Sequence, residues 1–154
     1  MSKFFYSPVI GIDVSADFSY AAILAPNGDV YKKPFKIKHD LNGFNHLVNE
    51  IKKVEEEFNM KTAIFMESTG VYHLSLFHYL NNNFDNTFVI NPLITKSNKN
   101  GDIRKVKNDK KDSLSIATIG KFQNIKLSQS LDLDIFLLKN LVREYYKLTD
   151  SCST

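Results

Sequence analysis

The order in which the hydrophobic pattern changes its period is the feature that most constrains the fold of this chain. Three short apolar runs come first, and Asn27-Gly28, a strong hairpin signal, separates the second from the third. A segment with apolar residues three and four apart follows, which is typical of an amphipathic helix. Strand and helix patterns then alternate, which favours an α/β fold with a mixed five-stranded sheet and flanking helices. The predicted strands are 9–14, 20–24, 30–38, 62–67 and 87–91, and the predicted helices are 41–58, 72–84, 108–122 and 133–148.

The composition favours one globular domain in a reducing compartment. The 154 residues are 43% hydrophobic and 12% aromatic, which is enough for a buried core and argues against a disordered chain. Cys152 is the single cysteine, so neither an intramolecular disulfide nor a cysteine-based zinc site can form. The sequence contains no secretory signal and no run of the roughly 18 apolar residues that a membrane span requires. We therefore expect a cytoplasmic protein with no membrane partner.

Positive charge is concentrated in one stretch of the chain. The formal net charge is only +3, but the segment 95–111 is crowded with lysine and arginine and has few apolar residues. Such a stretch can hold a nucleic-acid backbone through phosphate contacts, although Lys110 and Lys111 could equally face water. The candidate nucleic-acid-binding residues are Lys96, Lys99, Arg104, Lys105, Lys107, Lys110 and Lys111.

Four carboxylates stand out by their positions in the predicted elements. Asp13 lies near the end of the first strand and Glu67 ends the fourth. If these strands are parallel neighbours, both acids emerge at one sheet edge, where open α/β sheets bind ligands. Asp109 and Asp112 are three residues apart near a helix start, so they share a helix face. Each acid alone is more commonly structural, so the combined pattern carries the prediction.

A cluster of these four acids predicts a metal site. Clustered carboxylates resist full ionisation unless a cation compensates their charge, and Mg²⁺ or Mn²⁺ is the natural partner of such oxygen ligands. Two such ions can clamp the attacking and leaving oxygens of a phosphoryl transfer. We therefore expect Asp13, Glu67, Asp109 and Asp112 to be catalytic metal ligands for two ions.

Several motifs resemble the N-terminal, RuvC-like domain of the DEDD transposases of the insertion sequence 110 family, which are related to the Piv and MooV recombinases. The matching segments lie in order at 11–15, 66–72, 91–92, 107–112 and 116–117. The resemblance implies a ribonuclease H-like fold, and it places Asp13, Glu67, Asp109 and Asp112 on the four metal-binding carboxylates of the family. It also implies DNA transposition, an element-encoded guide RNA and a homo-oligomeric full-length protein.

The chain departs from this family pattern mainly in its length. Family members commonly have other residues at Ala16, Asn108 and Ser113, but none of these changes removes a carboxylate. They continue through a coiled coil into a second domain that supplies a serine nucleophile. We therefore expect a catalytic domain over 1–130 and the start of a coiled-coil helix over 131–154, truncated before the second domain.

Two other functions remain open at this stage. A sugar-kinase or actin-like ATPase half also opens with Gly11-Ile12-Asp13, although its phosphate loop normally has glycine where this chain has Ser15. A truncated, non-catalytic domain could instead bind nucleic acid or form a dimer through an apolar stripe in the last helix. Metal-independent DNA binding with a steep salt dependence would favour that second alternative.

Overall fold

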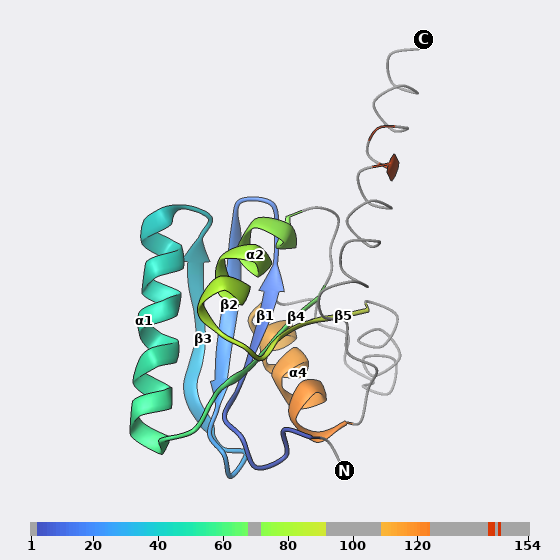
Figure 1. Ribbon diagram of the computed structural model, residues 1–154. Helices are drawn as coiled ribbons and strands as arrows, with labels where there is room; N and C mark the ends of the chain where they lie inside the picture. Colours follow the sequence, from blue (N-terminus) through green and yellow to red (C-terminus); the bar gives the residue numbers. More distant parts are fainter. Residues whose placement is uncertain (1–2, 68–71, 92–108, 124–141, 144, 146–154) are drawn as a thin grey trace.

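The computed structural model describes residues 3–67, 72–91, 109–123, 142–143 and 145, which contain five strands and three complete helices (Figure 1). Their order along the chain agrees with the pattern predicted from the sequence. The elements are β1 (Val9–Val14), β2 (Phe18–Leu24), β3 (Val30–Lys38), α1 (Leu41–Phe58), β4 (Ala63–Glu67), α2 (His73–Asn83), β5 (Thr87–Ile90) and α4 (Asp109–Phe122).

The five strands form one mixed sheet in the order β3-β2-β1-β4-β5. β2 pairs antiparallel with both β1 and β3, as expected of a meander, whereas β4 pairs parallel with β1 and β5. The parallel neighbourhood of β1 and β4, which the sequence left as an assumption, is thereby confirmed. β2 begins two residues earlier than predicted, because Phe18 and Ser19 also pair with β3.

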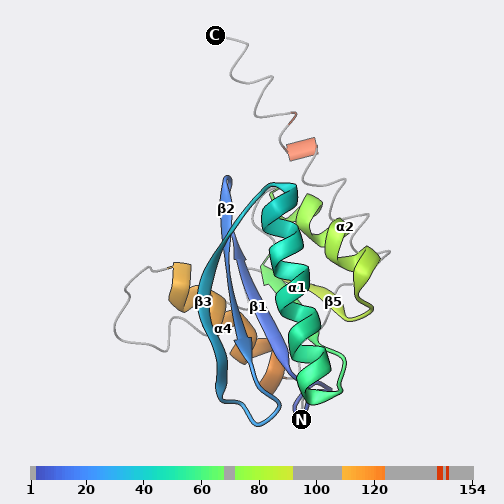
Figure 2. The same cartoon turned by 90° about the vertical axis from the view of Figure 1, so that its left-hand side faces the viewer.

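Helices cover both faces of the sheet: α1 and α2 lie on one face, and α4 lies on the other (Figure 1; Figure 2). Successive strand residues point to opposite faces, so each buried strand feeds two apolar clusters. Ile10 and Ile12 of β1 pack beneath α1 and α2, while Val9 packs with Ile116 and Ala117 of α4. The sheet is thus the middle layer of a three-layer domain.

The predicted boundaries of α1 are confirmed and have clear local causes. Asp40 caps the N-terminus by accepting a hydrogen bond from the backbone N–H of Gly43 at 2.7 Å. Asn59 ends the helix in the left-handed conformation, with φ of 49°. Leu47, Ile51 and other apolar residues at helical spacing are fully buried against the sheet.

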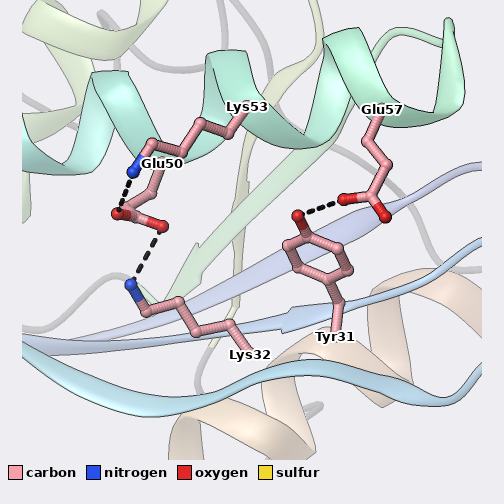
Figure 3. Close-up of polar contacts among 5 residues, drawn as sticks. All are labelled: Tyr31, Lys32, Glu50, Lys53 and Glu57. Carbon is pink, nitrogen blue, oxygen red and sulfur yellow. Dashed lines mark hydrogen bonds and ion pairs between the residues drawn. The ribbon is translucent and has the colours of Figure 1, made fainter.

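Polar side chains tie α1 to the edge strand β3 (Figure 3). The Glu50 carboxylate accepts from Lys32 at 2.9 Å and from Lys53 at 3.3 Å, and the hydrogen bond from Lys32 lowers the pKa of Glu50. The hydroxyl of Tyr31 donates to Glu57, which raises the pKa of that tyrosine. Charged residues of α1 therefore contribute to its packing against β3.

The predicted last helix, 133–148, falls largely outside the described residues. Val142, Arg143 and Tyr145 within it are helical, and all three side chains are exposed. Most of the basic stretch, up to residue 108, also lies outside the described part of the chain. Among the helices that are described, none combines the length and the apolar character needed to cross a membrane.

Candidate active site

Asp13 and Glu67 are neighbours at the carboxyl ends of two parallel strands. The register pairs Ile12 of β1 with Met66 of β4, and the next residue of each strand is one of the two acids. Both side chains are half-buried. By strand alternation they point to the same face as Gly11 and Phe65, which is the face that α4 covers.

Gly11 allows α4 to contact this face closely. A Cβ atom at Gly11 would lie 2.2 Å from the carbonyl oxygen of Ser113 and 2.3 Å from the backbone nitrogen of Ala117. Any side chain at this position would therefore collide with the helix backbone. Gly11, two residues before Asp13, is therefore needed for packing. This packing brings the first half of α4 over β1.

The opposite end of α4 is fixed by Lys121. Its fully buried ammonium donates to the backbone carbonyls of Phe5 and Ser7, at 2.7 Å each, and burial lowers its pKa. Phe5 and Ser7 precede β1, whereas Ser113 lies above Gly11 further along the strand. α4 therefore runs antiparallel to β1, and its first turn lies toward the end of the strand that carries Asp13.

This orientation directs the start of α4 toward the two strand-end acids. Asp112 is half-buried in the first turn, and Asp109 is the first residue of the helix. The side chain of Asp109 lies outside the described residues, as do those of Lys110 and Lys111. Acidic residues are favoured at a helix N-terminus because they interact favourably with the helix dipole.

The oxygen donors of this region match the preferences of a hard cation. Within the part of the chain that the structure describes, no three His, Cys, Asp or Glu side chains gather closely enough to hold a metal ion. Mg²⁺ in proteins is commonly held by one or two carboxylates together with water and substrate phosphates. The adjacent pair of Asp13 and Glu67 fits that donor set, and the site with all four carboxylates stays a prediction.

Five of the predicted basic contacts lie outside the described residues: Lys96, Lys99, Arg104, Lys105 and Lys107. His73, which follows the Glu67 block in the sequence, is fully buried at the start of α2. It therefore belongs to the packed interior and not to the exposed surface beside Glu67.

His39 is a residue that the sequence patterns missed. Its Nδ1 lies 3.2 Å from the carbonyl oxygen of Ala16, and its Nε2 lies 2.6 Å from Ser19 Oγ. Because a carbonyl only accepts, Nδ1 donates to Ala16, and Nε2 shares a hydrogen bond with the serine hydroxyl. These bonds hold the turn that follows Asp13. Sequence spacing gave no signal for them, since His39 is 20 residues from Ser19.

Strand order, helix placement and strand-end acids together define a ribonuclease H-like domain of the RuvC type. The solved structure of Thermus thermophilus RuvC is similar, with a TM-score of 0.50 and 15% sequence identity over 79% of this chain and 99% of RuvC. T. thermophilus RuvC in complex with a Holliday junction substrate gives a TM-score of 0.48 and 13% identity, with the same coverage. At such low identity the likeness concerns the fold.

The sequence match to a family model shows the family to which this chain belongs. The model of the DEDD transposases of insertion sequence 110, described as "Transposase", matches residues 10–154, and the chain belongs to this family. No curated protein matches the chain. The resemblance found in the motifs is thereby confirmed, and so is the RuvC-like fold that it implied.

Proposed function

We propose that this domain carries out divalent-metal-dependent phosphoryl transfer on DNA during transposition. Asp13, Glu67, Asp109 and Asp112 are the proposed catalytic carboxylates, and Mg²⁺ or Mn²⁺, as two ions, is the proposed cofactor. The observation that carries the proposal is the adjacency of Asp13 and Glu67 at the ends of β1 and β4. Membership of a transposase family supplies the reaction class.

In this proposal each structural element has a separate task. The paired strands hold Asp13 and Glu67 at a fixed spacing, because their backbones are hydrogen-bonded up to the preceding residues. α4, seated on Gly11, directs Asp112 and the start of the helix toward them. When bound, divalent cations supply Lewis acidity for the displacement at phosphorus. Asp13 and Glu67 would hold these cations at the ends of β1 and β4, and the hydrogen bonds of His39 keep the turn after Asp13 in place.

The wider arrangement is also a proposal. The DNA is held by the basic residues of the stretch from Lys96 to Lys111, of which the last two belong to the first turn of α4. Residues 1–130 form the catalytic domain, 131–154 begin a coiled-coil helix, and the full-length protein is a homo-oligomer. An element-encoded guide RNA is the further partner that the family resemblance implies.

The proposal is tested by thermal unfolding of the full chain with and without Mn²⁺ or Mg²⁺. A ligand that binds only the folded state raises its stability by RT ln(1 + [L]/Kd), about 2.7 kcal/mol at 100 times Kd. We expect this stabilisation in the wild type and its loss in Asp13→Asn and Glu67→Gln. Asp17→Asn is the matched control, because Asp17 is exposed in the turn after β1.

Nicking of supercoiled DNA in the presence of Mn²⁺ gives the functional readout for the same variants. We expect activity in the wild type and in Asp17→Asn, and none in Asp13→Asn. Equal metal stabilisation of all four proteins would contradict the proposed site, whatever the result of the nicking assay.

A further inference from the structure

A row of polar side chains crosses the sheet next to the proposed active site. In the antiparallel pairing, Asp13 of β1 lies opposite Tyr20 of β2, and Tyr20 lies opposite Lys36 of β3. Glu67 of β4 continues the row on the other side of Asp13. Since residues that are paired across strands point to the same face, the row runs from a cation through an aromatic ring to two carboxylates.

The cationic end of this row is supported by aromatic rings. The Lys36 ammonium lies 4.4 Å from the ring centroid of Phe18, which places it over the ring. The rings of Phe18 and Tyr20 meet edge to face, with centroids 5.6 Å apart. Lys38, the partner of Phe18 across the strands, is exposed, as is Lys36. A cation–π contact restricts the position of an otherwise flexible lysine.

We propose that Phe18, Tyr20, Lys36 and Lys38, the β2–β3 platform, bind the backbone of the DNA strand that reacts at Asp13 and Glu67. This inference rests on the proposed function and names a second contact surface for the same substrate. Neighbouring strands are about 5 Å apart, so Lys36 stands about 10 Å from Asp13 across the sheet. The platform therefore contacts phosphates close to the reacting one.

Charge complementarity supports this occupant. A pair of carboxylates repels the phosphodiester backbone, and cations on the same face offset that repulsion. Lysine binds phosphate as a point charge and needs no bidentate geometry. The two platform lysines face the Asp13 side of the sheet, whereas Lys32 of the same strand is paired with Glu50 under α1.

The lysines of the platform could serve only to prevent the edge strand β3 from pairing with other molecules, but this role alone does not account for the platform. β3 is an edge strand, and lysines on edge strands commonly prevent pairing with other molecules. That role requires charge along the strand but does not require an aromatic ring beneath the ammonium. The row also leads directly to Asp13 through Tyr20, which edge protection does not require.

The test measures DNA binding by the full chain in EDTA, so that metal binding does not contribute. Fluorescein-labelled single-stranded and duplex oligonucleotides are titrated at several salt concentrations. We expect the Lys36→Ala/Lys38→Ala variant to bind several-fold more weakly and to make the negative slope of log K against log salt shallower by about 1.5. Phe18→Ala keeps both charges, so we expect about threefold weaker binding with an unchanged slope. Lys52→Ala, an exposed lysine on α1 across the sheet, is the matched control.

A loss on single strands and duplex alike, or on single strands alone, supports the platform. Unchanged affinity and slope relative to Lys52→Ala overturns it, provided that thermal unfolding shows both proteins folded. Lys36→Arg/Lys38→Arg should restore the slope, which a purely structural role would not require.

The two proposals can fail separately. If the lysine variant binds DNA normally while Asp13→Asn abolishes metal stabilisation, the platform is wrong and the active site stands. If the lysine variant loses DNA binding while metal stabilises Asp13→Asn as much as the wild type, the DNA surface stands and the proposed catalytic site is wrong. A wild-type chain that binds neither oligonucleotide overturns the platform outright.

Discussion

Gly11 of β1 and Ala117 of α4 are in direct backbone contact: a Cβ atom at Gly11 would lie 2.3 Å from the Ala117 nitrogen. This contact seats α4 on the sheet, and the seating turns the start of the helix toward Asp13. The glycine in the motif Gly11-Ile12-Asp13 thus has a packing role that is separate from the chemistry of the aspartate.

Gly11→Ala should therefore destabilise the fold. The added methyl group must displace the helix backbone, and overpacking of this kind typically costs about 1–3 kcal/mol. Urea unfolding monitored by circular dichroism measures the change. Ser115→Ala, at a half-buried position of α4, should change the unfolding free energy little. Equal stability of Gly11→Ala and the wild type would show that α4 does not rest on β1.

Lys121→Ala should also destabilise the protein, by about 2–3 kcal/mol, because two carbonyls lose a charged donor. The carbonyls of Phe5 and Ser7 are the groups affected. Urea unfolding gives the magnitude, with Lys52→Ala as the exposed control, expected within about 0.5 kcal/mol of the wild type. A loss no larger than that of the control would mean that the N-terminal segment is not held by α4.

Asp13 and Glu67 should act on metal binding as one unit. Each single neutralisation removes half of a shared donor set, so Asp13→Asn/Glu67→Gln should lose no more Mn²⁺ stabilisation than either single variant. A double-mutant cycle on the Mn²⁺-induced shift of the unfolding midpoint measures this coupling. Strictly additive losses would indicate two independent carboxylates.

Glu50 should make stability depend on pH in the acid range. Its pKa is lowered in the folded state, chiefly by the hydrogen bond from Lys32, from an ordinary value of 4.5. The folded protein thus binds this proton less readily than the unfolded chain, so the contribution is present above about pH 4.5 and is lost as the pH falls.

Unfolding free energies between pH 3 and pH 7 test this dependence, and Glu50→Gln should flatten it in the acid range. Glu56→Gln, at an exposed position of the same helix, should retain the wild-type profile. Parallel profiles for the wild type and Glu50→Gln would contradict the predicted linkage.

Much of the fold could be predicted because its signals are local. The strand β1, the hairpin at Asn27-Gly28 and the capped helix α1 each depend on residues a few positions apart. Strand-end placement likewise identified Asp13 and Glu67 as candidates. The start of β2 was predicted two residues late, because Phe18 and Ser19 are strand residues through pairing with the neighbouring strands β1 and β3.

The sequence by itself determined the type and order of the elements, the family, and which acids stand at strand ends. Only the tertiary structure decided which acids are neighbours, which way α4 runs and which face of the sheet carries the β2–β3 platform. The physical reason is range. Helix and strand periods depend on residues that are close in the sequence. Strand order and helix direction depend on contacts such as that of Lys121 with Ser7, which are 114 residues apart.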